Sequence, residues 1–254
     1  MGAQDLAWAK ELRRRAERLV RDVEHTPMAA VPTPTRAELA GMIDHTVLKP
    51  EATPEVIDVA CVEAREHRFA TVCVNPCHVQ RVARGLAGSR VAVCSVVGFP
   101  LGANVSEVKA YEAEQAIHDG AGEIDMVIPV GALKAGDYAY VRDDIATVLV
   151  PCRRLGAILK VIIEAALLTD VEKAIACILT AEAGAHFAKT STGFGPGGAT
   201  ERDVRLMRLV VGPDLGVKAA GGVRTYEQAL AMIRAGATRI GASAGPAILA
   251  GGPA

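Results

Sequence analysis

The chain has 254 residues, half of them apolar, and 28 Lys and Arg residues balance 29 Asp and Glu residues to a net charge of −1. Such a balance excludes a strong global attraction to nucleic acid or to an anionic membrane, and no segment has the length and apolarity of a membrane span. Only 4% of the residues are aromatic, and Val, Ile, Ala and Leu dominate the rest, which favours parallel strands with packing helices over a β-sandwich.

The first 36 residues differ in pattern from the remainder. Apolar residues recur at helical spacing among five arginines: Leu12, Ala16, Leu19, Val20 and Val23. Pro32 and Pro34 then interrupt the pattern. We expect residues 1–36 to be an N-terminal helical extension packed on a main domain of residues 37–254, with an RNA-binding arm as the alternative.

The main domain alternates strand and helix patterns. Apolar, β-rich runs occur near residues 43–48, 69–74, 90–97, 124–129, 157–163, 186–189, 215–219 and 238–241. Helical patterns follow at 54–67, 76–86, 104–119, 138–155, 169–184, 200–211, 225–235 and 243–250, and Ser106 is a candidate cap for the third. Eight such units predict an α/β fold, a closed (β/α)8 TIM barrel, with an open doubly wound sheet as the alternative.

Catalytic residues of such a barrel gather at the carboxyl ends of its strands. Lys189 and Lys218 both end a short apolar run, and Asp125 lies within another. A buried carboxylate is costly unless it is paired, and the charge of one lysine makes its neighbour easier to deprotonate. The pattern therefore predicts a neutral amine nucleophile, and a purely structural ion-pair network is the alternative.

Other polar residues at the same rim complete the predicted site. Gly221 and Gly222 follow Lys218, and Gly241 and Ser243 precede the last helix, which is typical of the phosphate site of this fold; ordinary turn glycines are the alternative. We also expect Asp44, Thr46, Cys73, Lys160 and Thr192 near the substrate pocket. The glycine pattern of residues 193–198 has G-x-G-x-x-G spacing, but it follows the sixth strand and lacks the acidic partner of a dinucleotide site.

The cysteines indicate neither disulfides nor a metal. The chain has six of them and no C-x-x-C pair, and no second ligand pair accompanies Cys73, Cys77 and His78 at zinc-finger spacing. We expect buried reduced thiols, no metal and no cofactor.

The first residues lack the apolar core of a signal peptide, so we expect a cytoplasmic protein.

The motifs taken together resemble the deoxyribose-phosphate aldolases, a class I aldolase family, from about residue 40 to residue 250. The resembling segments are Ile43-Asp-His-Thr-Val-Leu-Lys-Pro, Thr71-Val-Cys-Val-Asn-Pro, Val96-Val-Gly-Phe-Pro-Leu-Gly, Glu123-Ile-Asp-Met-Val, Gly131-Ala-Leu-Lys-Ala-Gly-Asp-Tyr, Leu159-Lys-Val-Ile-Ile-Glu, Phe187-Ala-Lys-Thr-Ser-Thr-Gly-Phe and Val217-Lys-Ala-Ala-Gly-Gly-Val-Arg. The sequence departs from the family where Ser243 stands alone before the last helix, where Pro129 replaces asparagine, and where some members end in tyrosine.

The resemblance implies a role for each motif residue. Lys189 would form the Schiff base, Lys218 would be the second lysine, and Asp125 would relay protons. Gly193, Gly221, Gly222, Gly241 and Ser243 would bind phosphate. The implied reaction is reversible cleavage of 2-deoxy-D-ribose 5-phosphate to D-glyceraldehyde 3-phosphate and acetaldehyde, without metal or cofactor, and we expect a homodimer.

Three other functions remain open at this point. The chain could be a Schiff-base aldolase for another phosphorylated sugar, or a barrel that binds sugar phosphates without catalysis. The lysine pair disfavours the second, because pure binding gains little from a neutral amine. A metal-dependent class II aldolase is disfavoured by the absence of a ligand cluster in the sequence.

Overall fold

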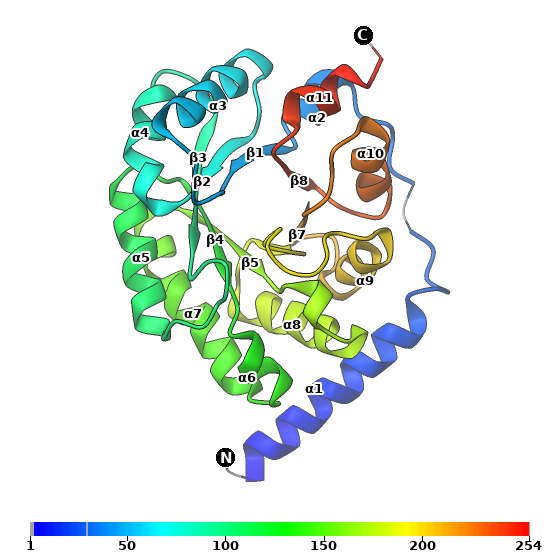
Figure 1. Cartoon of the computed structure of the whole chain (residues 1–254). Helices are drawn as coiled ribbons and strands as arrows, with labels where there is room; N and C mark the ends of the chain where they lie inside the picture. Colours follow the sequence, from blue (N-terminus) through cyan, green and yellow to red (C-terminus); the bar gives the residue numbers. More distant parts are fainter. Residues whose placement is uncertain (1–2, 29, 254) are drawn as a thin grey trace.

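The computed structural model describes residues 3–28 and 30–253; the remaining residues of the predicted segments 1–36 and 37–254 lie outside the described ones. Eight parallel strands close into a barrel in chain order, with helices outside them (Figure 1). The strands are β1 (Ile43–Val47), β2 (Thr71–Val74), β3 (Ala92–Val97), β4 (Glu123–Val127), β5 (Ile158–Ile162), β6 (Phe187–Lys189), β7 (Gly216–Ala220) and β8 (Arg239–Ala242). The predicted (β/α)8 barrel is confirmed, and the open sheet is excluded because β1 pairs with β8.

The helices that the sequence predicted lie close to their expected positions, and several short helices add to them. They are α1 (Ala3–Asp22), α2 (Arg36–Ala40), α3 (Pro54–His67), η1 (Pro76–His78), α4 (Val79–Gly85), α5 (Ser106–His118), α6 (Val130–Lys134), α7 (Tyr138–Leu155), η2 (Ala165–Leu167), α8 (Asp170–Ala183), α9 (Glu201–Val211), α10 (Tyr226–Arg234) and α11 (Gly245–Ala250). Within the described part of the chain, no helix is long and apolar enough to cross a membrane.

Two local predictions need correction. The pattern at 76–86 is not one helix, because a 3-10 turn, η1, precedes α4. Ser106 does not cap α5: Val105 occupies the N-cap, and the Ser106 hydroxyl donates instead to Asp144 Oδ1 at 2.8 Å. The sequence could not show this, because the buried carboxylate that accepts from the Ser106 hydroxyl lies on another helix, α7.

Strand alternation divides the side chains between two layers. On β4, Ile124 and Met126 belong to the apolar core between the barrel and its helices. Glu123 and Asp125 alternate with them and face the barrel axis, where they meet charged partners from other strands. The barrel interior therefore holds a polar cluster inside a shell of Val, Ile, Leu and Ala residues, and this arrangement places the site.

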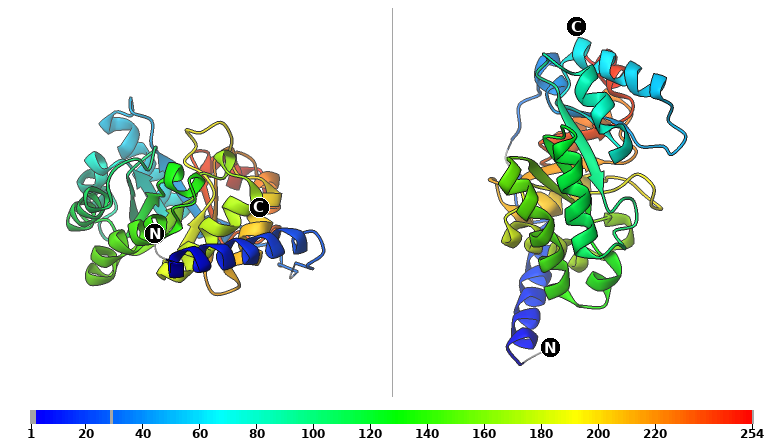
Figure 2. Two further views of the ribbon diagram at one scale, coloured as in Figure 1. Left: turned by 90° about the horizontal axis from the view of Figure 1, so that it is seen from below. Right: turned by 90° about the vertical axis from the view of Figure 1, so that its left-hand side faces the viewer.

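Helix α1 lies across the outside of the barrel against α8 and α9 (Figure 2). Leu12, Ala16 and Val23 are buried in this contact, and the arginines of the other face are exposed. Polar contacts add to this packing in the middle of α1 and just after it: Arg15 donates to Glu182 at 3.3 Å, and Arg205 donates to the Val23 carbonyl at 2.8 Å. The apolar stripe read from the sequence is thus the packed face, while the RNA-binding alternative stays a prediction.

Candidate active site

Three strands bring Asp125, Lys189 and Lys218 to one point. Lys189 of β6 and Lys218 of β7 are in register on adjacent parallel strands, so their side chains point to the same side. Both amines contact Asp125 Oδ2, each with its Nζ at 2.7 Å. All three residues are buried, with exposed fractions of 2% or less. The barrel therefore brings together the three residues that the sequence predicted to meet at one point.

A wider ionic network surrounds this triad. Lys160 Nζ bonds Asp125 Oδ1 at 2.7 Å and Glu123 Oε2 at 2.6 Å. Arg239 bonds Asp44 Oδ1 at 2.6 Å and Glu123 Oε2 at 3.1 Å, and Lys218 contacts Asp44 Oδ2. The network contains three carboxylates and four basic groups. If one amine is neutral, the remaining charges balance, and a buried cluster favours balance.

The environment fixes the charge of most members. Burial raises the pKa of the Asp125 carboxyl, but the neighbouring lysines, Lys160, Lys189 and Lys218, outweigh burial and hold that pKa well below its usual value. Burial lowers the pKa of Lys218, and the carboxylates of Asp125 and Asp44 outweigh it, so this pKa is raised. Lys218 is accordingly held as a cation beside Lys189.

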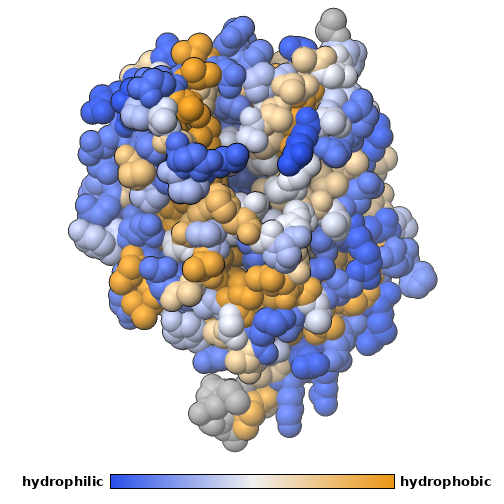
Figure 3. Space-filling model, viewed as in Figure 1, coloured by the Kyte–Doolittle hydropathy of each residue, from blue (hydrophilic) through white to orange (hydrophobic). Residues whose placement is uncertain are grey.

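A cavity of about 660 Å³ opens above the network at the carboxyl ends of the strands. Figure 3 shows the hollow from the side of the barrel mouth. Among the described residues of the network, Lys189 alone lines this cavity. A molecule in the cavity therefore meets the Lys189 amine first, while Lys218 and Asp125 act from behind it.

The predicted phosphate residues form another part of the cavity wall. Gly193, Gly221, Gly222, Gly241 and Ser243 all line it. Gly193, Gly221 and Gly222 have positive φ angles of 87°, 90° and 83°, which few other residues adopt. Among the described residues, no hydrogen bond uses the backbone N–H groups of these three glycines or of Ser243. Such unpaired N–H groups in left-handed loops are suited to an anion.

Gly241 has a second reason to lack a side chain. A Cβ atom there would lie 3.0 Å from Lys218 Cε and 2.9 Å from Ala220 Cβ. The glycine therefore makes room for the Lys218 side chain to reach Asp125.

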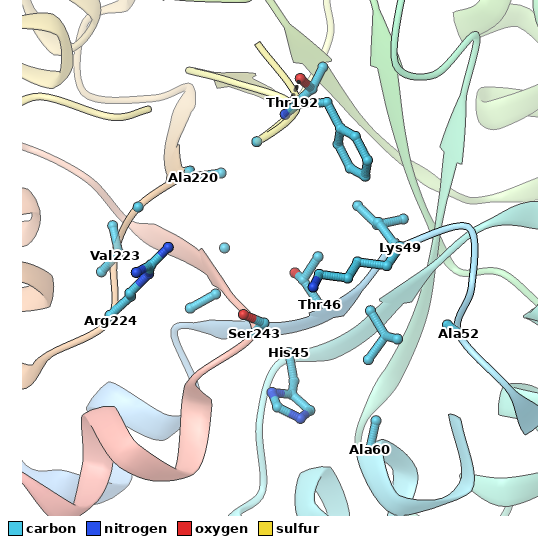
Figure 4. Close-up of a pocket in the computed structure, with 18 of the residues that line it drawn as sticks. His45, Thr46, Lys49, Ala52, Ala60, Thr192, Ala220, Val223, Arg224 and Ser243 are labelled. Atoms are coloured by element: carbon cyan, nitrogen blue, oxygen red, sulfur yellow. Dashed lines mark hydrogen bonds between the residues drawn. The ribbon is translucent and has the colours of Figure 1, made fainter. Parts of the chain in front are cut away.

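The other predicted pocket residues divide into two groups. Thr46 and Thr192 line the cavity (Figure 4). Asp44, Cys73 and Lys160 lie beneath it in the barrel interior and are fully buried. The strand-end pattern could not separate the two groups, because it locates a residue along its strand but not its depth below the mouth.

Cys73, Cys94 and Asp125 place potential metal ligands within 4.8 Å of one another. Lys160 Nζ already donates to two of them, at 3.4 Å to Cys94 Sγ and 2.7 Å to Asp125 Oδ1. An ammonium group thus occupies the position that a cation would take. Cys77, the partner in the zinc-finger interpretation, is exposed on η1, and Cys73 is buried in β2.

Comparison with known proteins places the chain in a family. Residues 39–251 match the model of the DeoC/LacD family aldolases. The chain belongs to this family. It is 61% identical over 214 residues to a deoxyribose-phosphate aldolase of Enterococcus faecalis, with 84% of this chain and 97% of the relative covered. It is 59% identical to deoxyribose-phosphate aldolase 1 of Bacillus licheniformis, over 84% of this chain and 96% of the relative.

A solved structure has a similar fold. The tetrameric deoxyribose phosphate aldolase of Aeropyrum pernix superposes with a TM-score of 0.80 at 32% identity, covering 85% of this chain and 91% of the other. The family match begins at residue 39, so helix α1 lies outside it.

The sequence-based prediction missed several residues of this site. Arg224 and Lys49 reach toward the cavity from opposite sides (Figure 4). Arg224 follows the Gly221-Gly222 loop by two positions, and a cation so close to a glycine loop was the available signal. Glu123 is two residues before Asp125 and shares its face, whereas Arg239 opens β8 and reads as an ordinary surface charge.

Proposed function

We propose that this protein is a class I aldolase that reversibly cleaves 2-deoxy-D-ribose 5-phosphate to D-glyceraldehyde 3-phosphate and acetaldehyde, with Lys189 as the Schiff-base residue. The observation that carries the proposal is the position of Lys189. It lines the cavity and shares Asp125 Oδ2 with the cation Lys218. Deoxyribose-phosphate aldolases that are about 60% identical over most of their length support the choice of substrate.

The covalent steps follow from a neutral amine at Lys189. Its Nζ attacks the C1 aldehyde to give a carbinolamine, which loses water to become an iminium ion. The iminium accepts the electron pair of the C2–C3 bond as the C3 hydroxyl loses its proton. Glyceraldehyde 3-phosphate departs with C3 as its new aldehyde, and an enamine remains on Lys189. Protonation at C2 and hydrolysis then release acetaldehyde and restore the amine.

Proton transfers are assigned to the groups behind the nucleophile. Asp125 contacts both lysines through one oxygen, so a proton can pass among the three without large movement. Lys218 stays charged because Asp125 and Asp44 raise its pKa, whereas Lys189 is the amine that lines the cavity. The pair therefore has unequal roles: Lys189 reacts, and Lys218 maintains its reactivity.

The phosphate end is assigned to the glycine loops. Gly193, Gly221, Gly222 and Ser243 present N–H groups at the cavity that bond no other described residue, and Arg224 adds a cation. Holding the phosphate there orients the sugar, so that C1 lies at Lys189 and binding energy contributes to positioning.

The test is product analysis. The protein is incubated with deoxyribose 5-phosphate and, separately, with fructose 1,6-bisphosphate, and aldehydes are followed with coupled dehydrogenases. We expect acetaldehyde and glyceraldehyde 3-phosphate from the first alone. Cleavage of fructose 1,6-bisphosphate at a comparable rate would favour the aldolase for another sugar, and binding without turnover would favour the non-catalytic barrel.

We also propose that the chain forms a homodimer, since barrels of this kind commonly pair through outer helices. The Aeropyrum pernix relative is described as a tetramer, so larger assembly is the competing outcome. Sedimentation velocity at micromolar concentration distinguishes monomer, dimer and tetramer.

A further inference from the structure

Glu164 is a buried carboxylate that the mechanism above does not use. It follows β5 and is 4% exposed. Within the described part of the chain, no cation forms a salt bridge with it. A buried carboxylate without a cation is costly, so its hydrogen bonds must compensate, and they lead to one place in the site.

All of its side-chain partners are in the loop after β6. The backbone N–H of Thr192 lies 3.3 Å from Oε1 and 3.4 Å from Oε2, and the Thr192 hydroxyl donates to Oε2. Thr192 Oγ1 in turn accepts the N–H of Phe194 at 3.0 Å. Gly193 is enclosed between these bonds. The carboxylate therefore fixes the peptide units on both sides of a predicted phosphate glycine.

The loop is folded closely over this carboxylate. A Cβ atom on Gly195 would lie 3.0 Å from Glu164 Cδ, so the glycine makes room for the acid. Glu164 itself lies behind Thr192 and does not line the cavity, whereas Thr192, Gly193 and Phe194 do. It acts on the cavity only through the loop.

The backbone of Glu164 is also specialised. It has φ 53° and ψ 62°, in the left-handed region that non-glycine residues rarely occupy. Ile163 N–H donates to the Lys189 carbonyl at 3.0 Å, and Ala165 N–H donates to the Thr190 carbonyl at 2.8 Å. The two donors are two residues apart on the β5 side, whereas their acceptors are one residue apart on the β6 side. The β5 side therefore contains one extra residue, Glu164, as in a β-bulge. The extra residue is held by bonds on both sides, which is how such strain persists at functional sites.

We propose that Glu164 is a positioning residue for phosphate binding: its carboxylate holds Thr192, and through Thr192 the N–H of Gly193, in the geometry that receives the substrate phosphate. This inference rests on the proposed function for the identity of the substrate. It predicts that loss of the carboxylate impairs recognition of the phosphate while the chemistry at Lys189 continues.

The experiment compares two substrates. Glu164→Gly removes the carboxylate and tolerates the left-handed backbone. We expect KM for deoxyribose 5-phosphate to rise about tenfold, the loss of roughly one charge-assisted hydrogen bond, with kcat nearly unchanged. For unphosphorylated 2-deoxyribose, kcat/KM should change less than about twofold. An equal loss on both substrates, or on neither, overturns the proposal.

A matched control separates anchoring from general stability. Glu38 accepts the N–H and hydroxyl of Thr35 at 2.7 and 2.8 Å, the same pair of donors, at the start of α2. Glu38→Gly should alter the melting temperature but not the ratio of kcat/KM for the two substrates. If Glu164→Gly does not fold, Thr192→Val replaces it, since it exchanges the hydroxyl for a methyl group of similar size; Thr192→Ser keeps the hydroxyl and should recover most of the loss.

Binding of inorganic phosphate distinguishes the proposed role of Glu164 from the proposed aldolase function. Its Kd is measured by calorimetry on the wild type and on Glu164→Gly, and it should rise about tenfold, by the same ~1.4 kcal/mol. A wild type that does not cleave deoxyribose 5-phosphate while this shift is present refutes the proposed function and retains the role of Glu164. Cleavage with an unchanged phosphate Kd refutes the role of Glu164 alone.

Discussion

Lys189 and Lys218 lie in register on the adjacent strands β6 and β7, and the Nζ atom of each lies 2.7 Å from Asp125 Oδ2. The two amines differ in what lies on their other side. Lys218 is fully buried and also contacts Asp44, whereas Lys189 reaches the cavity. This asymmetry distinguishes the nucleophile from its supporting cation, and the first two predictions depend on it.

Replacing Lys189 should abolish imine formation. We expect Lys189→Leu to give no borohydride-trapped adduct with acetaldehyde, because no other amine of the described network lines the cavity, and Lys49, which also lines it, is an exposed side chain outside the network. Peptide mass mapping locates the adduct in the wild type and shows its loss in the variant. Lys134→Leu, at a partly exposed lysine outside the cavity, is the control and should keep the adduct. Persistent labelling at Lys160 or Lys218 would defeat the assignment.

Replacing the groups behind Lys189 should slow turnover without unfolding the barrel. We expect Lys218→Leu and Asp125→Asn each to reduce kcat on the order of 10²–10⁴ fold, the range for loss of an acid–base group. Lys218→Leu leaves three carboxylates with three basic groups, and Asp125→Asn keeps the size of the side chain, so circular dichroism should stay native in both variants. Near-normal turnover in Lys218→Leu would make this lysine purely structural.

The barrel and the central triad could be predicted because both depend on local pattern. Lys189, Lys218 and Asp125 each interrupt a short apolar run, and parallel strands end at one rim. Periodicity gives no comparable signal for the Lys109–Asp144 pair, whose members lie on α5 and α7 and are both fully buried. Charged residues on helices ordinarily face solvent, so only the packing of the two helices reveals the pair.

Glu164 shows a second limit of prediction. Its left-handed backbone and its bonds to Thr192 follow from a bulge between β5 and β6, which depends on the pairing of two strands. Arg239 is similar, since it joins the network only because closing the barrel brings β8 beside β1 and β7. Sequence patterns locate residues along elements, whereas these contacts arise between elements.

His45 should make stability fall at mildly acidic pH. Burial lowers the pKa of His45, and the hydrogen bond and charge of Glu63 oppose that effect without cancelling it; the nearby His67 lowers this pKa further. A neutral His45 is thus favoured in the folded state, so its contribution is complete above about pH 6.5 and declines as pH falls below it. His45→Gln should flatten the slope of unfolding free energy between pH 7 and 5, by at most about 1.4 kcal/mol per pH unit.

Urea titrations at several pH values measure this slope. His25→Gln, at an exposed histidine after α1 that does not affect the pKa of His45, is the control and should keep the wild-type slope. An unchanged slope in His45→Gln would show that other groups cause the acid sensitivity.

Breaking the buried pair on α5 and α7 should be costly. Lys109 Nζ bonds Asp144 Oδ2 at 2.8 Å and the Val127 carbonyl at 3.0 Å. Lys109→Met leaves Asp144 buried without its cation, and we expect a loss of about 3–5 kcal/mol in unfolding free energy. Lys109→Met combined with Asp144→Asn should recover at least half of it, because no buried charge remains. Urea denaturation measures both, and equal losses in the single and double variants would contradict this account.

Helix α1 should detach when its packed face is charged. Ala16 is fully buried against the barrel, so Ala16→Asp places an unpaired carboxylate in an apolar contact, at a cost of about 2 kcal/mol or more. Arg18→Asp introduces the same side chain on the exposed face of α1 and serves as the control. Limited proteolysis should cut the segment after α1 much faster in Ala16→Asp than in Arg18→Asp. Equal cleavage would mean that α1 contributes little to holding this segment on the barrel.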